Sequence, residues 1–248
     1  HIQEDLHLRA LLTGKEKYCL RLSEIRFDKR KAVGILQIGI PSAFQYSLFA
    51  FANLFVQSSV NSFDHVLVEG NSAAANADPL VYDMMAAFYT ACSSFIAQNF
   101  GARKKKRILQ TYLICLFYSF ITSLVLGVGI YLARYPFLYL FTSDKAVVEA
   151  GITRLSIMAL SYSASAFMDA SIAASRGLGK TAVPTFVVVM GSCVFRIIWI
   201  YTIFAYFHTI QSLYILYVFS WGITAIAENI YFFHVYRHTL TGKTESHL

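Results

Sequence analysis

Five ionisable side chains stand inside long apolar runs of this 248-residue sequence: Asp78, Asp83, Asp169, Arg196 and Glu228. A charged group at the centre of a membrane helix costs about 2.5 to 3.5 kcal/mol on insertion scales, so such groups usually face a partner or a water-filled cavity. A carboxylate in a cavity can take up and release a proton or a cation as it meets each compartment. We therefore expect proton or cation binding at the aspartates.

Arg196 and Glu228 have a different expected role, as structural charges. At about 1.5 Å of rise per residue, their depths in the membrane can differ by as little as one helical turn, which is within side-chain reach. We therefore expect them to form an ion pair with each other or to anchor their helices at the membrane interface.

Uncharged polar residues share helical faces with these groups. Positions 42, 46, 53 and 57 follow spacings of 4, 7 and 4, and Tyr162, Ser165 and Asp169 follow spacings of 3 and 4. Such residues either hydrogen-bond to neighbouring helices across a bundle or line a polar cavity, and the sequence leaves both open. The cavity interpretation gives these substrate candidates: Gln45, Tyr46, Asn53, Gln57, Asn76, Asp78, Tyr82, Tyr162 and Ser165. Asp169 and Asp78 are then the candidates for ion coupling.

Pro79 directly follows Asp78 in the second apolar run. Proline lacks a backbone N–H and bends a helix, and the carbonyls it frees are tolerated at membrane depth where they line a cavity. We therefore expect a bent helix that exposes Asp78. Asp83 lies five residues on, about 140° round the helix, so the two carboxylates cannot face the cavity equally.

The composition and the missing motifs exclude several functional classes. Hydrophobic residues make up 56% of the chain and charged residues 14%, against about 25% charged in soluble domains. The net charge is +7, and the basic residues lie largely between the apolar runs. No motif that reads nucleic acid accompanies them. No HExxH or GxSxG occurs, the histidines avoid the centres of the runs, and the cysteines lack metal-ligand spacing. We expect no cofactor, no metal site, no nucleic-acid partner and no enzyme activity.

Six apolar runs have the length of membrane helices, which need about 20 mostly apolar residues. They cover residues 33–60, 68–97, 108–133, 151–175, 183–207 and 213–236. Lys and Arg gather in alternate connections: residues 1–32 are strongly basic and 103–107 read RKKKR, whereas 61–67 contain neither residue. Since cytoplasmic loops carry the Lys/Arg excess, we predict an all-α, multi-pass membrane protein that has both ends of this segment in the cytoplasm.

Several stretches together resemble the multidrug and toxic compound extrusion (MATE) family. They are GIPSAFQYSLFAFANLFVQSSVNSF (39–63), GNSAAAN (70–76), AQNFGARKKKR (97–107), LFTSD (140–144) and SRGLGKTAVP (175–184). Their order and spacing are similar to helices seven to twelve, the C-terminal half, and look most like the bacterial DinF-like branch. The resemblance implies one six-helix lobe of a two-lobe transporter, with a cytoplasmic linker at 1–32, the lobe at 33–236 and a cytoplasmic tail at 237–248.

That resemblance implies secondary active multidrug efflux across the bacterial plasma membrane. Small amphipathic or cationic organic compounds would be exchanged for H⁺ or Na⁺, in partnership with a missing N-terminal six-helix lobe and the lipid bilayer. Another branch of the family carries cation-binding carboxylates on helices seven and ten. Here the first run has no acidic residue, Ser165 takes the helix-ten position, and Asp169 lies one turn nearer the cytoplasm. The helix-one aspartate associated with the DinF-like branch is not in this sequence, so the coupling ion stays open.

Other functions remain as alternatives. A lipid-linked oligosaccharide flippase has similar lobes and is expected to carry more cationic residues in its cavity, where the sequence offers only Arg196. An intramembrane enzyme or a purely structural bundle would belong to different classes.

Overall fold

The computed structural model describes residues 27–239, apart from the side chain of Ile38, and the chain divides into two units between Gly39 and Ile40. The described part of the first unit is the start of helix α2 (Lys29–Val60). There the Asp28 carboxylate accepts hydrogen bonds from the backbone N–H groups of Arg30 and Lys31 and so caps the helix. Most of the predicted linker 1–32 and tail 237–248 lies outside the described residues.

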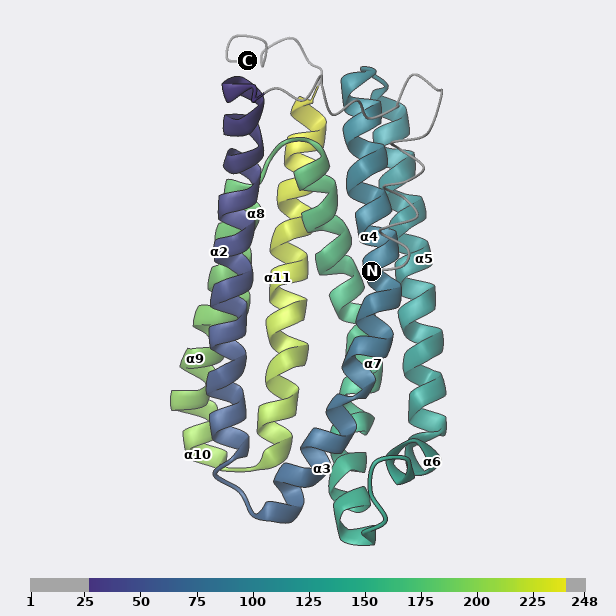
Figure 1. Ribbon diagram of the computed structural model, residues 1–248, viewed down its shortest axis with the longest axis vertical. Coiled ribbons are helices and arrows are strands. Elements are labelled where there is room, and N and C mark those ends of the chain that lie inside the picture. Colours follow the sequence, from purple (N-terminus) through teal and green to yellow (C-terminus); the bar gives the residue numbers. More distant parts are fainter. Residues whose placement is uncertain (1–26, 240–248) are drawn as a thin grey trace. The chain divides into compact units, whose positions relative to one another are not determined.

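The described residues form six helical segments long and apolar enough to cross a membrane, which confirms the predicted all-α fold (Figure 1). The first is α2 and the second joins α3 (His65–Ala75) to α4 (Ala77–Gly101). The third is α5 (Lys105–Leu132), the fourth α7 (Lys145–Gly177), the fifth Ala182–Phe207 and the sixth α11 (Ile210–His238). A short helix, α6 (Arg134–Tyr139), connects α5 to α7.

The second span breaks at Asn76, close to where the sequence predicts a bend. Pro79 occupies the first turn of α4, where its missing N–H breaks no hydrogen bond within that helix. The Asn76 side chain instead donates to the carbonyls of Ser72 and Ala73 at the end of α3. The break separates α3 from α4, so residues of both helices can approach one neighbour.

The fifth span is irregular over most of its length. It consists of α8 (Ala182–Val188), a π-helical turn η2 (Val189–Val194), α9 (Phe195–Trp199), a second π-helical turn η3 (Ile200–Phe204) and α10 (Ala205–Phe207). Such turns widen a helix locally and are frequent at functional sites. Arg196 lies in the short α-helical stretch between them.

Helix α7 is the centre of the bundle, because it packs against α3, α4, α5 and α11. It begins at Lys145, six residues before the predicted start of the span, since the Asp144 carboxylate caps it by accepting from the N–H of Ala146 at 2.8 Å. Small residues allow its neighbours to approach closely. A Cβ atom at Gly127 of α5 would lie 2.0 Å from the carbonyl oxygen of Ala159 on α7.

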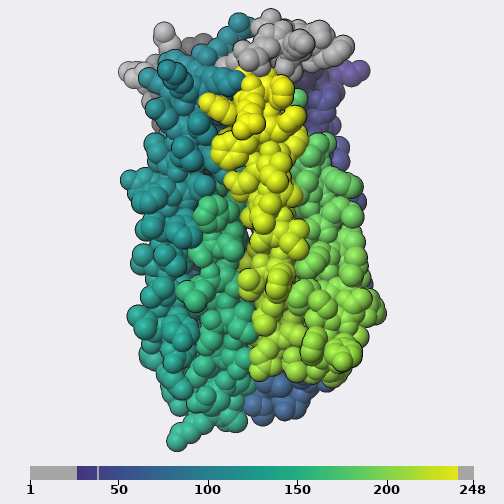
Figure 2. All heavy atoms as spheres, turned by 180° about the vertical axis from the view of Figure 1, so that it is seen from behind, coloured from purple at the N-terminus to yellow at the C-terminus, as the bar shows by residue number. Residues whose placement is uncertain are grey.

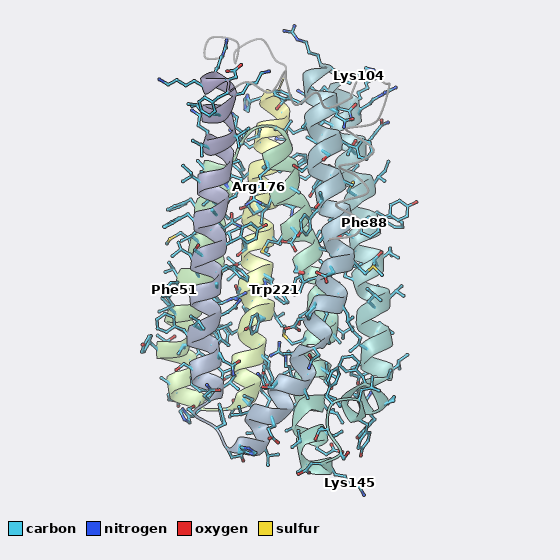
Figure 3. The ribbon with its side chains drawn as sticks, viewed as in Figure 1. Phe51, Phe88, Lys104, Lys145, Arg176 and Trp221 are labelled. Carbon is cyan, nitrogen blue, oxygen red and sulfur yellow. The ribbon has the colours of Figure 1, made fainter. Side chains whose placement is uncertain are left out.

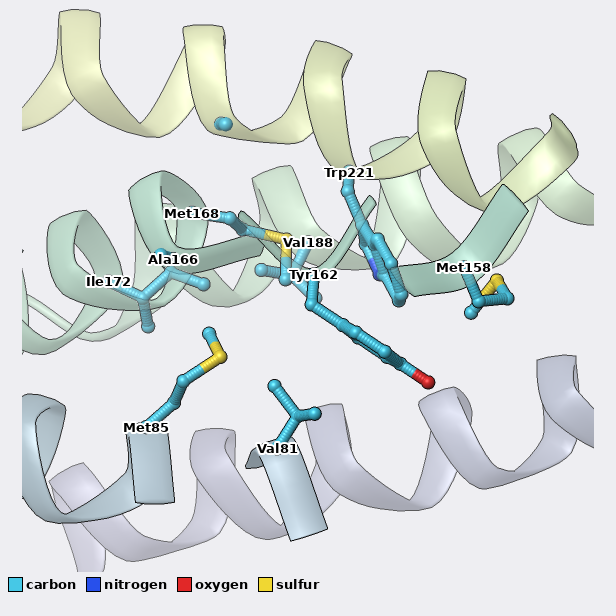
Figure 4. Close-up of a cluster of buried hydrophobic side chains, with 10 residues drawn as sticks. Val81, Met85, Met158, Tyr162, Ala166, Met168, Ile172, Val188 and Trp221 are labelled. Atoms are coloured by element: carbon cyan, nitrogen blue, oxygen red, sulfur yellow. The ribbon is translucent and has the colours of Figure 1, made fainter. Parts of the chain in front are cut away.

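Side chains from α4, α7 and α11 pack together in one buried hydrophobic cluster. In Figure 4, Val81 of α4 points toward Tyr162 of α7 and Met85 of α4 toward Ala166 and Ile172, while Trp221 lies beside Tyr162. The surface carries many exposed hydrophobic side chains, such as Phe51, which is 63% exposed (Figure 3). On the opposite face, α11 runs between the teal segments of α5 and α7 and the green segments of the fifth span (Figure 2). An apolar surface of this extent fits a lipid environment.

We expect Gly127→Ala to destabilise the bundle by about 1 to 3 kcal/mol, because the new methyl group would force α5 away from α7. Gly129 is the matched control: it lies on the same helix with nothing within 4 Å of its Cβ position. Gly129→Ala should be neutral or stabilise the helix by up to about 1 kcal/mol. Thermal unfolding of the detergent-purified protein, followed by the reactivity of the buried cysteines, measures both. Equal behaviour of the two variants would contradict the close approach.

A second prediction concerns topology. Lys104 and Lys145 lie at opposite ends of the bundle in Figure 3 and are both exposed. Lys104→Cys should react with a membrane-impermeant maleimide only after the cytoplasmic face is opened, because the cation run marks that face. Lys145→Cys should react in intact cells. Labelling of both from the same side would overturn the arrangement of spans.

Candidate functional site

A cavity of about 540 Å³ opens between the membrane-spanning segments. Helices α2, α3, α4, α7, α8 and α11 all contribute to its wall. It has the size of a pocket for a drug-like molecule, about 300 to 1,000 Å³. Aromatic and aliphatic side chains form much of the wall, and the polar and charged residues on it are Gln45, Tyr46, Asn53, Gln57, Asn71, Asp78, Tyr82, Tyr89, Arg154, Asp169, Arg176, Tyr214, Tyr217 and Trp221.

One wall of the cavity is built around Arg154 of α7, which is only 7% exposed. Its Nη2 lies 2.5 Å from Oδ2 of Asp78, and its Nη1 donates to Oδ1 of Asn71 at 2.7 Å. The hydroxyl of Tyr162 donates to the other oxygen of the Asp78 carboxylate, and the guanidinium lies 5.9 Å from the ring of Tyr214. Asp78 is therefore an ion-paired, hydrogen-bonded carboxylate.

The break at Asn76 makes this arrangement possible. Asn71 belongs to α3 and Asp78 to the first turn of α4, and the break brings both to the same guanidinium. Asp78 also lies at the positive end of the α4 dipole, which favours a carboxylate there. The ion pair with Asp78 and the hydrogen bond to Asn71 together join three helices, α3, α4 and α7, at the cavity wall.

A second polar group lies nearer the end of α7. Asp169 lines the cavity, and its carboxylate makes no hydrogen bond that the structure records among residues 27–239. Arg176, seven residues on and on the same face, donates from Nη2 to Oε1 of Gln45 on α2 at 2.9 Å. Its guanidinium also lies 6.0 Å from the ring of Tyr46. Asp169 thus faces the cavity with its oxygens available.

Arg196 is fully buried beside the cavity, and its partners are uncharged. Its guanidinium lies 4.6 Å from the ring of Phe49 and 4.5 Å from that of Tyr217, and it donates to Asn53 at 2.7 Å and to Ser220 at 3.3 Å. Two cation–π contacts, one amide and one hydroxyl surround the guanidinium in place of an acidic partner, and its Nη2 makes no hydrogen bond within residues 27–239.

The expected ion pair between Arg196 and Glu228 is wrong. Arg196 meets α11 at Ser220, eight residues and so about 12 Å along the helix from Glu228. Both carboxylate oxygens of Glu228 are buried and without a hydrogen-bond partner. Both side chains are 0% exposed, so neither reaches the surface of the described bundle.

The structure brings most of the predicted site residues together. Those that line the cavity are Gln45, Tyr46, Asn53, Gln57, Asp78, Tyr82 and Asp169. Asn76, Tyr162 and Ser165 do not line it, contrary to expectation. Asn76 satisfies the end of α3, Ser165 donates to the backbone carbonyl of Tyr162 within α7, and Tyr162 supports Asp78 from the core. Asp83 is exposed and does not line the cavity.

Arg154 and Arg176 are the cavity cations that sequence reasoning missed. Arg154 lies close to the predicted start of its span, where a cation usually belongs to the neighbouring loop. A usable signal existed: Arg154, Met158 and Tyr162 follow spacings of four, which places Arg154 on the buried face of α7. Arg176 carries no comparable signal, because cations are common at helix C-termini.

The donor set fits monovalent cations or protons better than a transition metal. Within residues 27–239, no group of three or more His, Cys, Asp or Glu side chains could hold a metal ion. The cavity combines one free carboxylate, Asp169, with tyrosine hydroxyls and aromatic faces. Such a wall can hold an amphipathic molecule and exchange a small cation.

The comparisons with known proteins agree with the fold. The family model MatE matches residues 41–202. Among solved structures, a MATE protein in the straight conformation has a TM-score of 0.86 at 18% identity. An outward-facing multidrug resistance MATE family transporter of the MOP superfamily has 0.85 at 18%. The Vibrio cholerae MATE transporter VcmN in its bent form has 0.83 at 16%.

In each of these comparisons the match covers 96% of this chain and 54% of the solved one, so the chain spans about half the length of the structures it resembles. Comparison with curated proteins gives no match. The structural likeness shows the fold, and the family model covers well over half of the chain. This multi-pass membrane chain belongs to the MatE family of transporters.

Proposed function

We propose that this chain is the C-terminal lobe of a bacterial plasma-membrane antiporter that exports amphipathic, mostly cationic organic compounds in exchange for H⁺ or Na⁺. The observation that carries the proposal is the cavity of about 540 Å³ between the spans, with aromatic walls and a carboxylate, Asp169, that makes no hydrogen bond to any residue from 27 to 239. The partner would be an N-terminal six-helix lobe facing the cavity. Both ends of the segment are proposed to lie in the cytoplasm, on the side of the cation run 103–107.

Asp169 is the residue that we assign to ion coupling. An ionised carboxylate at membrane depth must be paired, hydrated or neutralised. Asp169 has no hydrogen-bond partner among the described residues. Binding of a proton or a cation would therefore strongly lower the free energy of its carboxylate. Substrate and coupling ion would compete for the same charge, which is the requirement for exchange.

Asp78, the other expected coupling residue, has a structural part in this proposal. The Asp78 carboxylate already has Arg154 and Tyr162 as partners, so removing its charge would leave a buried guanidinium without a counter-ion. Its contribution to transport is then indirect, through the geometry of the break between α3 and α4.

A flippase for lipid-linked anions is the second candidate, and one observation favours it. Arg154 and Arg176 both line the cavity and Arg196 lies directly beside it, whereas the sequence offered Arg196 alone. One solved relative, a MOP superfamily transporter from Pyrococcus furiosus with a TM-score of 0.85 at 18% identity, is described as having a binding pocket of reverse polarity, which suggests a different function for that protein. For this chain, however, Arg154 is neutralised by Asp78, which leaves less positive charge for an anionic head group.

Efflux measurements test the proposal directly. In cells that express the complete gene product, we expect export of a fluorescent organic cation that stops when the ion gradient is collapsed. Asp169→Asn should lower the initial rate by roughly tenfold or more, because the amide keeps the shape but cannot exchange a cation. Surface expression should be unchanged.

Asp83→Asn, on the exposed face of α4, is the control and should export normally. If Asp169→Asn exports at the normal rate over a series of external pH and Na⁺ values, the coupling site lies elsewhere. If an anionic lipid-linked substrate moves without any ion gradient and the organic cation does not, the flippase is the better description.

The role given to Asp78 leads to a stability prediction. Asp78→Asn should lower the free energy of unfolding by about 1.5 to 3 kcal/mol, because it leaves Arg154 buried with only polar neutral partners. Arg154→Gln should cost a similar amount, and the double variant should cost less than the sum, which reveals coupling between the two side chains. Asp83→Asn should stay within about 0.5 kcal/mol of the unmodified protein. Strictly additive effects in thermal unfolding would argue against the ion pair.

A further inference from the structure

A groove of about 580 Å³ lies between α5 and α11 and shares no lining residue with the cavity described above. Helix α7 packs against both neighbours and supplies the floor with Ser163, Ala164 and Phe167. Phe120 lines the groove on α5, and five residues from Gly222 to Ile230 line it on α11. Figure 2 shows this face, with α11 in yellow beside the teal segments.

The polar side chains of the groove already have partners within the protein. The Ser163 hydroxyl donates to the backbone carbonyl of Leu160 at 2.6 Å. The Asn229 amide donates to the backbone carbonyl of Ala225 at 2.8 Å and accepts a hydrogen bond from the Tyr112 hydroxyl at 2.6 Å. The other lining side chains are apolar. The groove therefore suits a hydrocarbon chain better than a polar ligand.

A cation cluster, consisting of residues 103–107 and Arg237, lies where α5 begins and α11 ends. The Lys105 ammonium joins the two helix ends, because it donates to the Arg237 carbonyl at 2.9 Å and lies 5.3 Å from the ring of Tyr236. The segments 97–142 and 229–239, which carry the cluster, contain no Asp or Glu. Basic sites of this kind between membrane helices attract anionic lipid head groups.

The distance from the cation cluster to the far end of the groove matches one leaflet of a bilayer. Gly222 precedes Arg237 by 15 residues, which is about 22 Å along α11. One head-group layer and half of the hydrocarbon core together measure about 20 to 22 Å. A head group on the cation cluster therefore brings the end of its acyl chain into the groove. Two exposed residues of α11, Phe233 and Ile230, supply apolar surface on the way.

The cross-section of the groove favours an acyl chain over a docked helix. From Gly222 to Ile230 the groove is about 12 Å long, so its volume of about 580 Å³ gives a mean cross-section of about 50 Å². An α-helix 10 to 12 Å across needs about 80 Å² or more. We propose that the cation cluster and the groove together bind one anionic phospholipid, with its phosphate on Lys105 and Arg237 and an acyl chain between α5 and α11.

This proposal does not rest on the transport activity proposed above, because a protein that exports nothing can still bind the lipid. Binding is measured on the detergent-purified complete gene product. The probes are phosphatidylglycerol and phosphatidylcholine with identical chains that carry a diazirine near the chain end. Native mass spectrometry counts the bound lipids, and peptide mapping after illumination locates the labelled residues.

We expect phosphatidylglycerol to label residues 222–230 or Phe120 roughly tenfold more strongly than phosphatidylcholine does, because the cation cluster holds its net negative charge. The double variant Lys105→Gln/Arg237→Gln should lose this preference, with affinity for phosphatidylglycerol lowered by roughly tenfold or more. Lys145→Gln, at the opposite end of the bundle in Figure 3, is the control and should bind as the unmodified protein does.

A second variant tests the groove itself. No atom lies within 4 Å of a Cβ built at Gly222, so Gly222→Leu fills the groove with a side chain and should lower labelling there by roughly tenfold. Gly129→Leu is the matched control, because Gly129 of α5 has equally open space at its Cβ and lies outside the groove. If gel filtration shows that Gly222→Leu does not fold, the double variant at the cation cluster still decides the question.

The proposal is overturned if both lipids label the groove equally in the unmodified protein, or if Lys105→Gln/Arg237→Gln keeps the preference for phosphatidylglycerol. It is also overturned if folded Gly222→Leu is labelled as strongly as Gly129→Leu. Native masses of paired chains whose groove is no longer labelled would identify a second copy of this chain as the occupant instead of a lipid.

Discussion

The ion pair between Arg154 and Asp78 is the interaction on which the arrangement of the site depends. A guanidinium at this depth needs several hydrogen-bond acceptors, and no single helix can supply them. The break at Asn76 solves this problem, because it directs Asn71 of α3 and Asp78 of α4 to the same group. The tyrosine that completes the network, Tyr162, comes from α7 itself. Three helical segments are thereby fixed around one cation.

This use of Asp78 decides what the remaining polar residues can do. With Asp78 paired to Arg154, Asp169 is the remaining carboxylate among the described residues that line the cavity. Arg196 is held by two aromatic rings, the Asn53 amide and the Ser220 hydroxyl, with no carboxylate among these partners. Helix α2 is tied to the rest of the wall by two such bonds, Gln45 with Arg176 and Asn53 with Arg196. A hydrogen bond from a guanidinium to a neutral amide lacks the charge attraction of an ion pair. Less free energy is therefore lost when the guanidinium exchanges the amide for another partner.

The sequence predicts the fold well and the site only in part, for physical reasons. Apolar runs of more than 20 residues have few structural solutions, so six helices could be identified from periodicity and length alone. Periodicity also indicated the polar face of α2, whereas of the face shared by Tyr162, Ser165 and Asp169 only Asp169 lines the cavity. It could not pair residues 76 positions apart, as Asp78 and Arg154 are. Nor could it foresee the π-helical turns on either side of Arg196, which fix the helical face on which Arg196 meets its neighbours.

Arg176 makes its hydrogen bond to an uncharged partner, although a carboxylate shares its face of α7. Its Nη2 donates to Oε1 of Gln45 on α2 at 2.9 Å, and Asp169, seven residues earlier, lines the same cavity. An amide brings no counter-charge, so the guanidinium keeps its positive charge at the cavity wall. The polar groups of this wall therefore differ in kind: Arg154 is balanced by Asp78, whereas Arg176 is held by an amide.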